Sequence, residues 1–131
     1  MPMRVLVMVL LLMLVCDGRP YAQVPGFSVD VTWARSKACF DPQSPPFTLN
    51  GIPAGTRKLR FTMTDLDAPN FVHGGGAIVY GGQRSIPQGA FSYRGPCPPS
   101  GQHRYRWTVD AEDAAGHTLA TATITRKFPP E

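Results

Sequence analysis

Short stretches of alternating apolar residues, separated by glycine and proline turns, constrain the fold of this chain most strongly. The stretches richest in β-branched and aromatic residues are 29–33, 59–63, 77–80, 105–109 and 119–124. Such alternation is typical of strands, and no long stretch has the 3.6-residue apolar period of a helix. Glycine and proline number 13 and 14 in the 131 residues and mark turns between the stretches. The sequence therefore predicts an all-β sandwich.

The first 23 residues are predicted to be a signal peptide. Arg4 supplies positive charge ahead of an apolar run from Val5 to Val15. This run is too short to cross a bilayer but suits the apolar core of a signal peptide. Removal of residues 1–23 would leave residues 24–131 as one domain, exported to the periplasm or secreted, with no transmembrane span in the mature chain.

A second route of processing is open at Cys16, by lipoprotein maturation. The residue before it is valine, which is larger than the small residue normally needed there. Ordinary cleavage near Ala22 or Gln23 is therefore favoured. It would leave Cys39 and Cys97, and two cysteines in an exported chain favour a disulfide. Two free buried thiols are the alternative.

The charge and histidine patterns exclude several function classes. The whole chain has a formal charge of +4, but its arginines are scattered. No basic run is interleaved with aromatics, so nucleic acid is not an expected partner. The three histidines, at positions 73, 103 and 117, have no local metal-binding spacing. We expect no metal and no cofactor, and we expect His117 to be exposed in a hairpin turn.

Residues 93–105 join a stiff loop of glycines and prolines to a strand that begins with His103 and Tyr105. The loop backbone is restricted before any ligand arrives. Strand alternation places His103 and Tyr105 on the same face as Trp107 and Val109. Both would then lie at the edge of an apolar face, beneath a rigid rim, where they could hold a small anion or a polar headgroup. The alternative is an ordinary loop that leads into a half-buried strand.

Two carboxylates, Asp65 and Asp67, follow the apolar stretch 59–63 with the parity of its inward-facing residues. If the strand continues, they extend its apolar face, where burial is costly unless they are paired or hydrogen-bonded. If the strand has already ended, both would cap a solvated turn before Pro69.

These two segments resemble the signatures of the phosphatidylethanolamine-binding protein family, whose bacterial branch is often labelled Raf-kinase-inhibitor-like. Residues 65–69 read Asp-Leu-Asp-Ala-Pro, with leucine in place of the first proline of the family's Asp-Pro-Asp-Ala-Pro. Residues 95–105 match its Gly-x-x-Pro-Pro-x-Gly-x-His-Arg-Tyr run, and residues 44–56 resemble the segment before the first signature. The resemblance covers roughly residues 26–128. It implies an antiparallel β-sandwich with Greek-key-type connections and few or no helices.

The resemblance also implies a ligand pocket for a small anion or a phospholipid headgroup. The family's pocket positions correspond here to Asp65, Pro98, His103 and Tyr105, and Asp67 belongs to the first signature. The only histidine available as the second pocket histidine is His73, expected in a shortened loop. The family's C-terminal helix is not expected, so the site should be more open. We therefore predict ligand-binding roles for the following residues: Asp65, Asp67, His73, Pro98, His103 and Tyr105.

Two further functions are possible from the sequence. One is a cell-envelope module that binds or inhibits another protein without a small ligand. The other is a hydrolase, because His73-Gly74-Gly75-Gly76 resembles the oxyanion loop of esterases. The nucleophile elbow of those enzymes is missing, and no activated nucleophile accompanies Asp65, His103 and Tyr105, which could otherwise transfer protons. We therefore expect that the protein is not an enzyme. We expect the glycines after His73 to let a strand pass close to another backbone.

Overall fold

The computed structural model describes residues 26–33 and 38–131. The predicted signal peptide and Cys16 lie outside the described residues. The described chain contains the strands β1 (Ser28–Val31), β2 (Phe47–Asn50), β3 (Lys58–Asp65), β4 (Val72–Val79), β5 (Ser85–Ile86), β6 (His103–Glu112) and β7 (Thr118–Phe128).

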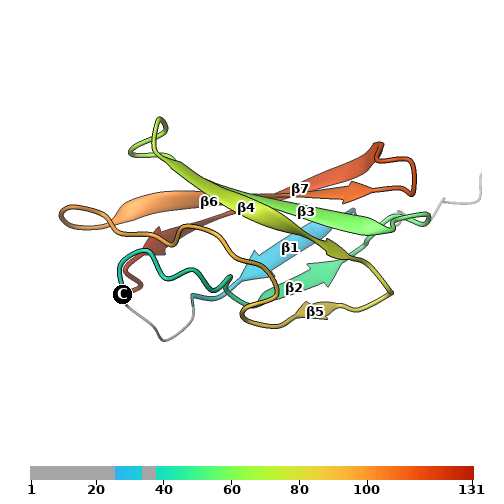
Figure 1. The fold of residues 1–131 in the computed structure, drawn as a ribbon, viewed down its shortest axis with the longest axis horizontal. Helices are drawn as coiled ribbons and strands as arrows, with labels where there is room; N and C mark the ends of the chain where they lie inside the picture. The colour runs from blue at the N-terminus through green and yellow to red at the C-terminus, as the bar shows by residue number, and fades with distance from the viewer. Residues whose placement is uncertain (1–25, 34–37) are drawn as a thin grey trace, which may run out of the picture.

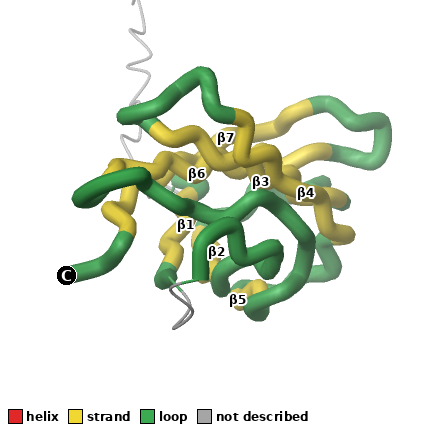
Figure 2. Tube along the Cα trace, turned by 60° about the vertical axis from the view of Figure 1, so that its left-hand side comes forward, coloured by secondary structure: helices red, strands yellow, loops and turns green. Residues whose placement is uncertain are grey.

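Two antiparallel sheets lie one above the other (Figure 1). The larger sheet has the order β4-β3-β6-β7 and the smaller one β1-β2-β5. After β4 the chain crosses to β5 in the smaller sheet and returns as β6 beside β3. No described residue is helical (Figure 2). The all-β sandwich predicted from the alternating pattern is therefore confirmed.

The core fills the space between the sheets with aromatic and aliphatic side chains. The ring centroid of Phe47 on β2 lies 4.7 Å from that of Phe61 on β3 and 5.0 Å from that of Trp107 on β6. These contacts join the two sheets through large apolar surfaces, whose burial is the main favourable term in folding. The alternation of buried and exposed residues along β3 and β6 agrees with the parity predicted from the sequence.

Strand β4 is longer than predicted, since it begins at Val72 whereas the sequence indicated a strand over 77–80. His73 therefore lies on a strand rather than in a shortened loop, which corrects that expectation. The sequence pattern hid the strand because three consecutive glycines carry no β-branched or apolar signal. A Cβ on Gly75 would lie 1.8 Å from the carbonyl oxygen of Phe61. The interpretation that the glycines allow close approach of two backbones is thus confirmed.

Cys39 and Cys97 form a disulfide, as the sequence favoured, with their Cα atoms 4.7 Å apart. The bond joins the segment before β2 to the loop before β6, so it restrains the end of the sandwich where the predicted site residues lie.

Within residues 26–33 and 38–131, no helix is long and apolar enough to cross a membrane. The same residues contain no cluster of three or more potential metal ligands.

We predict that Gly75→Ala destabilises the fold by about 1–3 kcal/mol, because the new methyl group must displace the backbone of Phe61. Gly26→Ala is the matched control, since a Cβ there meets nothing within 4 Å, and it should change stability by less than about 0.5 kcal/mol. Urea unfolding of both variants measures the difference. Equal stability of the two would contradict the close approach of β3 and β4.

Candidate functional site

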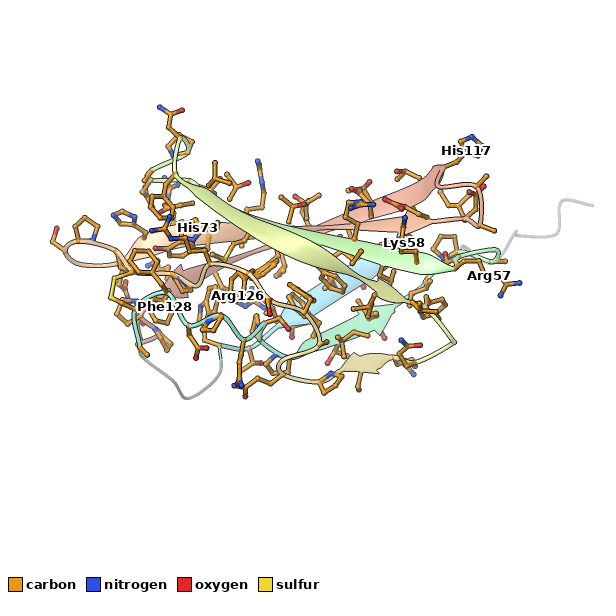
Figure 3. The ribbon with its side chains drawn as sticks, viewed as in Figure 1. Arg57, Lys58, His73, His117, Arg126 and Phe128 are labelled. Atoms are coloured by element: carbon orange, nitrogen blue, oxygen red, sulfur yellow. A yellow bond between two sulfur atoms is a disulfide. The ribbon has the colours of Figure 1, made fainter. Side chains whose placement is uncertain are left out.

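A small pocket opens where β3 ends and β4 and β6 begin. Its volume is ≈ 70 Å³. Figure 3 shows His73 at this end of the molecule, with Arg57, Lys58 and His117 at the opposite end. The pocket walls are apolar around a few polar groups, as is common in small-molecule sites. The lining residues are Phe40, Asp65, Ala68, Phe71, His73, Cys97, Pro99, His103 and Tyr105.

Asp65 ends β3 and is buried, with 3 % of its surface exposed. One oxygen, Oδ2, lies 2.7 Å from Nδ1 of His103, while Oδ1 accepts the backbone N–H groups of Asp67 at 2.9 Å and Ala68 at 3.1 Å. Burial opposes the charged form of Asp65. The hydrogen bonds from His103 and the backbone outweigh that effect and lower the pKa of its carboxyl group. Asp65 is therefore a buried carboxylate with its acceptors engaged.

Asp67 lies in the turn after β3 and does not line the pocket. Its carboxylate accepts the backbone N–H of Arg104 at 2.7 Å and the guanidinium Nη2 at 2.9 Å. The hydrogen bonds from Arg104 lower the pKa of Asp67 to about 2. Of the two alternatives, continuation of the apolar face holds for Asp65 and the turn after the strand holds for Asp67, because β3 ends at Asp65. Asp67 instead ties the turn to the start of β6.

His73 is buried on β4, with 4 % of its surface exposed. Its Nδ1 lies 2.6 Å from the carbonyl oxygen of Arg94. A carbonyl oxygen only accepts, so Nδ1 carries the proton. The other ring nitrogen, Nε2, is buried and has no hydrogen-bond partner in the described part of the chain. Nε2 has a lone pair in the neutral ring and becomes a donor when the ring is protonated.

His103, at the start of β6, also has its Nδ1 next to an acceptor of the protein. Its Nδ1 donates a hydrogen bond to the Asp65 carboxylate. Nε2 is left for a ligand, and it too donates only from the protonated ring. Both histidines therefore offer an anion a hydrogen bond when they carry positive charge.

Tyr105 lies between the two histidines, with its ring centroid 5.5 Å from that of His73 and 6.3 Å from that of His103. Its hydroxyl is buried near the Asp65 carboxylate and the backbone of Cys97, but it forms no well-aligned hydrogen bond with a described residue. Burial and the nearby Asp65 carboxylate raise the pKa of this phenol. The group is consequently a neutral O–H donor at physiological pH, and its position leaves the hydrogen available to a bound molecule.

Four of the six predicted site residues line the pocket: Asp65, His73, His103 and Tyr105. Asp67 and Pro98 do not, and the loop contributes Cys97 and Pro99 instead. The sequence analysis missed Phe40 and Phe71 as lining residues. Phe40 could have been found as the neighbour of Cys39, whose disulfide reaches the pocket loop. Phe71 could have been found only from its parity with His73 ahead of an unrecognised strand.

Within the described part of the chain, the pocket wall lacks the hydroxyl or free thiol nucleophile of the common hydrolases. No serine or threonine is among its lining residues, and the sulfur of Cys97 is in the disulfide. The glycines after His73 pair with β3, with Gly75 opposite Thr62 and Gly76 opposite Phe61. They therefore belong to a sheet rather than to an oxyanion loop. His117 is exposed, as predicted, and pairs with Asp113.

Comparison with known proteins identifies a consistent set of relatives. The sequence profile of the family described as phosphatidylethanolamine-binding protein matches residues 31–128. A UPF0098 protein of Methanothermobacter thermautotrophicus is 32% identical, with 53% of this chain and 60% of that protein covered. The chain thus spans less than two thirds of the length of this curated relative.

Two solved structures share the fold. The crystal structure of Escherichia coli YbcL, described as a new member of the mammalian PEBP family, superposes with a TM-score of 0.61 at 19% identity. That match covers 80% of this chain and 99% of the other. The putative PEBP homologue CT736 of Chlamydia trachomatis has a TM-score of 0.60 at 18% identity, covering 80% and 98%. At these identities the likeness concerns the fold alone.

Asp65 should make the stability of the protein depend on acid pH. A folded-state pKa below the unfolded value of about 3.9 stabilises the fold at higher pH, and that contribution is lost as pH falls through the depressed value. Asp65→Asn should therefore lower stability at about pH 7 by about 1–3 kcal/mol and flatten the acid-dependent loss. Urea unfolding across the acid range measures both effects. A variant with the wild-type pH profile would contradict this role.

Proposed function

Since the chain belongs to the phosphatidylethanolamine-binding protein family, we propose that its pocket binds a small anionic ligand, such as a phosphate group or a phospholipid headgroup. One observation carries the proposal. The buried Tyr105 hydroxyl and the buried Nε2 of His73 have no hydrogen-bond partner among the described residues, and both lie in the pocket wall. Buried polar atoms are normally paired, so an oxygen-rich ligand would complete their hydrogen bonding.

The size and charge of the site support an anion. A volume of ≈ 70 Å³ is well above that of a single water molecule, which needs about 10–15 Å³ on the same measure, and suits a phosphate-sized group. The Asp65 charge is offset by hydrogen bonds from His103 and two backbone N–H groups. Protonation of the histidines then makes the pocket an anion acceptor. Because no serine, threonine or free cysteine of the described residues lines its wall, we propose binding and not catalysis.

We also propose that the protein is exported, as its leader and its disulfide suggest. The mature chain should begin near Gln23 or Val24 and contain no free thiol until it is reduced. Intact mass, measured with and without reduction and alkylation, tests both points. A lipid-modified Cys16, or two thiols that react without reductant, would overturn the proposal.

Sulfate is the sharpest probe of the pocket, because its double negative charge does not change near neutral pH. NMR titration at about pH 6 should show sulfate-induced shifts of His73, His103 and Tyr105, because protonated imidazole rings and the tyrosine hydroxyl donate charge-assisted hydrogen bonds to the anion. His73→Ala and Tyr105→Phe should each weaken binding roughly ten- to hundredfold at about pH 6, the cost of one charge-assisted hydrogen bond.

His117→Ala is the matched control, since this exposed histidine lies at the opposite end of the molecule (Figure 3). It should bind sulfate as the wild type does. If the control weakens binding as much as His73→Ala, or if the sulfate-induced shifts fall outside the pocket, the pocket assignment is wrong. If the wild type binds neither sulfate nor phosphate at millimolar concentration, the protein-interaction alternative replaces the proposal.

A further inference from the structure

A guanidinium group lies against two aromatic rings of the pocket wall. The Cζ atom of Arg94 is 4.6 Å from the ring centroid of Phe40 and 4.6 Å from that of Phe71. The two rings are nearly parallel, 15° apart, with their centroids separated by 5.8 Å. Phe40 and Phe71 both line the pocket, and Phe40 is 40 % exposed. Arg94 is exposed and is not itself a lining residue, so its cation lies against the pocket wall and acts on a ligand from beside Phe40 and Phe71.

Covalent and hydrogen-bonded contacts hold this arrangement in place. Phe40 directly follows Cys39, whose disulfide to Cys97 fixes it to the pocket loop. Arg94 is bonded to His73 twice through its backbone, because its N–H donates to the carbonyl oxygen of His73 at 2.9 Å and its own carbonyl accepts from Nδ1 at 2.6 Å. The backbone of Arg94 is thus fixed to His73, one of the residues proposed to contact the ligand.

The charge of Arg94 is not cancelled by a neighbouring carboxylate. No ion pair to Arg94 occurs within residues 26–33 and 38–131. The two carboxylates of the first signature are already engaged, Asp65 with His103 and Asp67 with Arg104. The positive charge that lies against this wall is therefore not neutralised by an ion pair among the described residues.

We propose that Arg94 makes the pocket select phosphates that carry no ammonium group, an inference that rests on the proposed function. Aromatic faces at a pocket mouth would stabilise the cation of a zwitterionic headgroup, but here these rings already hold a guanidinium. An ammonium attached two carbons from the phosphate would meet a like charge, while the phosphate itself gains from the same charge. The favoured ligand is a phosphate ester with a neutral or anionic tail, unlike the zwitterionic lipid in the family's name.

The test compares two phosphate esters of nearly equal shape, 2-hydroxyethyl phosphate and 2-aminoethyl phosphate. At about pH 7 both are largely dianionic on phosphorus, because the second pKa of a phosphate ester is about 6. The wild type should bind the hydroxyl compound about five- to tenfold more tightly. Arg94→Gln should reduce this preference to within about twofold, and Arg94→Lys, which keeps the charge, should retain most of it.

Arg57→Gln is the matched control, because Arg57 lies at the opposite end of the molecule (Figure 3), and it should leave the preference unchanged. Equal binding of the two esters by the wild type, or an unchanged preference in Arg94→Gln, would overturn the inference. Sulfate titration of the same samples separates the two claims. If sulfate binds and the preference is absent, only the selectivity fails; if sulfate does not bind, the proposed function fails with it.

The phosphate could belong to a lipid or to a soluble ester. Dihexanoyl phosphatidylglycerol and dihexanoyl phosphatidylethanolamine, both dispersed as monomers, repeat the comparison with a diester headgroup. Tighter binding of the glycerol lipid than of 2-hydroxyethyl phosphate supports a lipid source, and the reverse supports a soluble one. In either case the glycerol lipid must bind better than the ethanolamine lipid. The opposite order would overturn the selectivity.

Discussion

The antiparallel pairing of β3 with β6 is the constraint on which the site depends. Its register places Asp65 opposite Tyr105, so the last residue of one strand and the first residues of the other share one end of the sandwich. The hydrogen bond from His103 to Asp65 and the bonds from Arg104 to Asp67 close that end. A shift of one residue would turn every side chain of a strand to the opposite face, and the site would be dismantled.

Some polar groups of the pocket are paired within the protein and others are not. One nitrogen of each histidine is engaged by the protein, by Asp65 for His103 and by the carbonyl of Arg94 for His73. Those bonds fix the rings and assign their protons. The remaining nitrogen of His73 and the hydroxyl of Tyr105 are buried without partners among the described residues, which costs stability in the empty protein. Under the proposed function, a bound anion would recover that cost by completing the hydrogen bonding of these atoms.

Strand alternation was sufficient to predict the all-β sandwich and the inward parity of β3 and β6, because a period of two follows directly from strand geometry. It failed for β4, where glycines replace the usual strand residues. Alternation also could not show that β3 ends at Asp65 and that Asp67 lies in the following turn, because the parity of residues does not indicate where a strand ends. Phe40 was missed for another reason: it comes from a segment far from the site in sequence and is brought there by the disulfide.

The sequence by itself determined which residues were candidates for the proposed anion site, since the types and spacing of Asp65, His103 and Tyr105 reflect side-chain chemistry and the two-residue period of a strand. It also determined that two cysteines were available to join the loops. Only the tertiary structure decided that His73 faces Tyr105, that Asp67 supports the turn, and that Arg94 lies on the rings of Phe40 and Phe71. The physical reason is that such contacts depend on strand order and loop path between residues distant in the chain, which local propensity and periodicity do not encode.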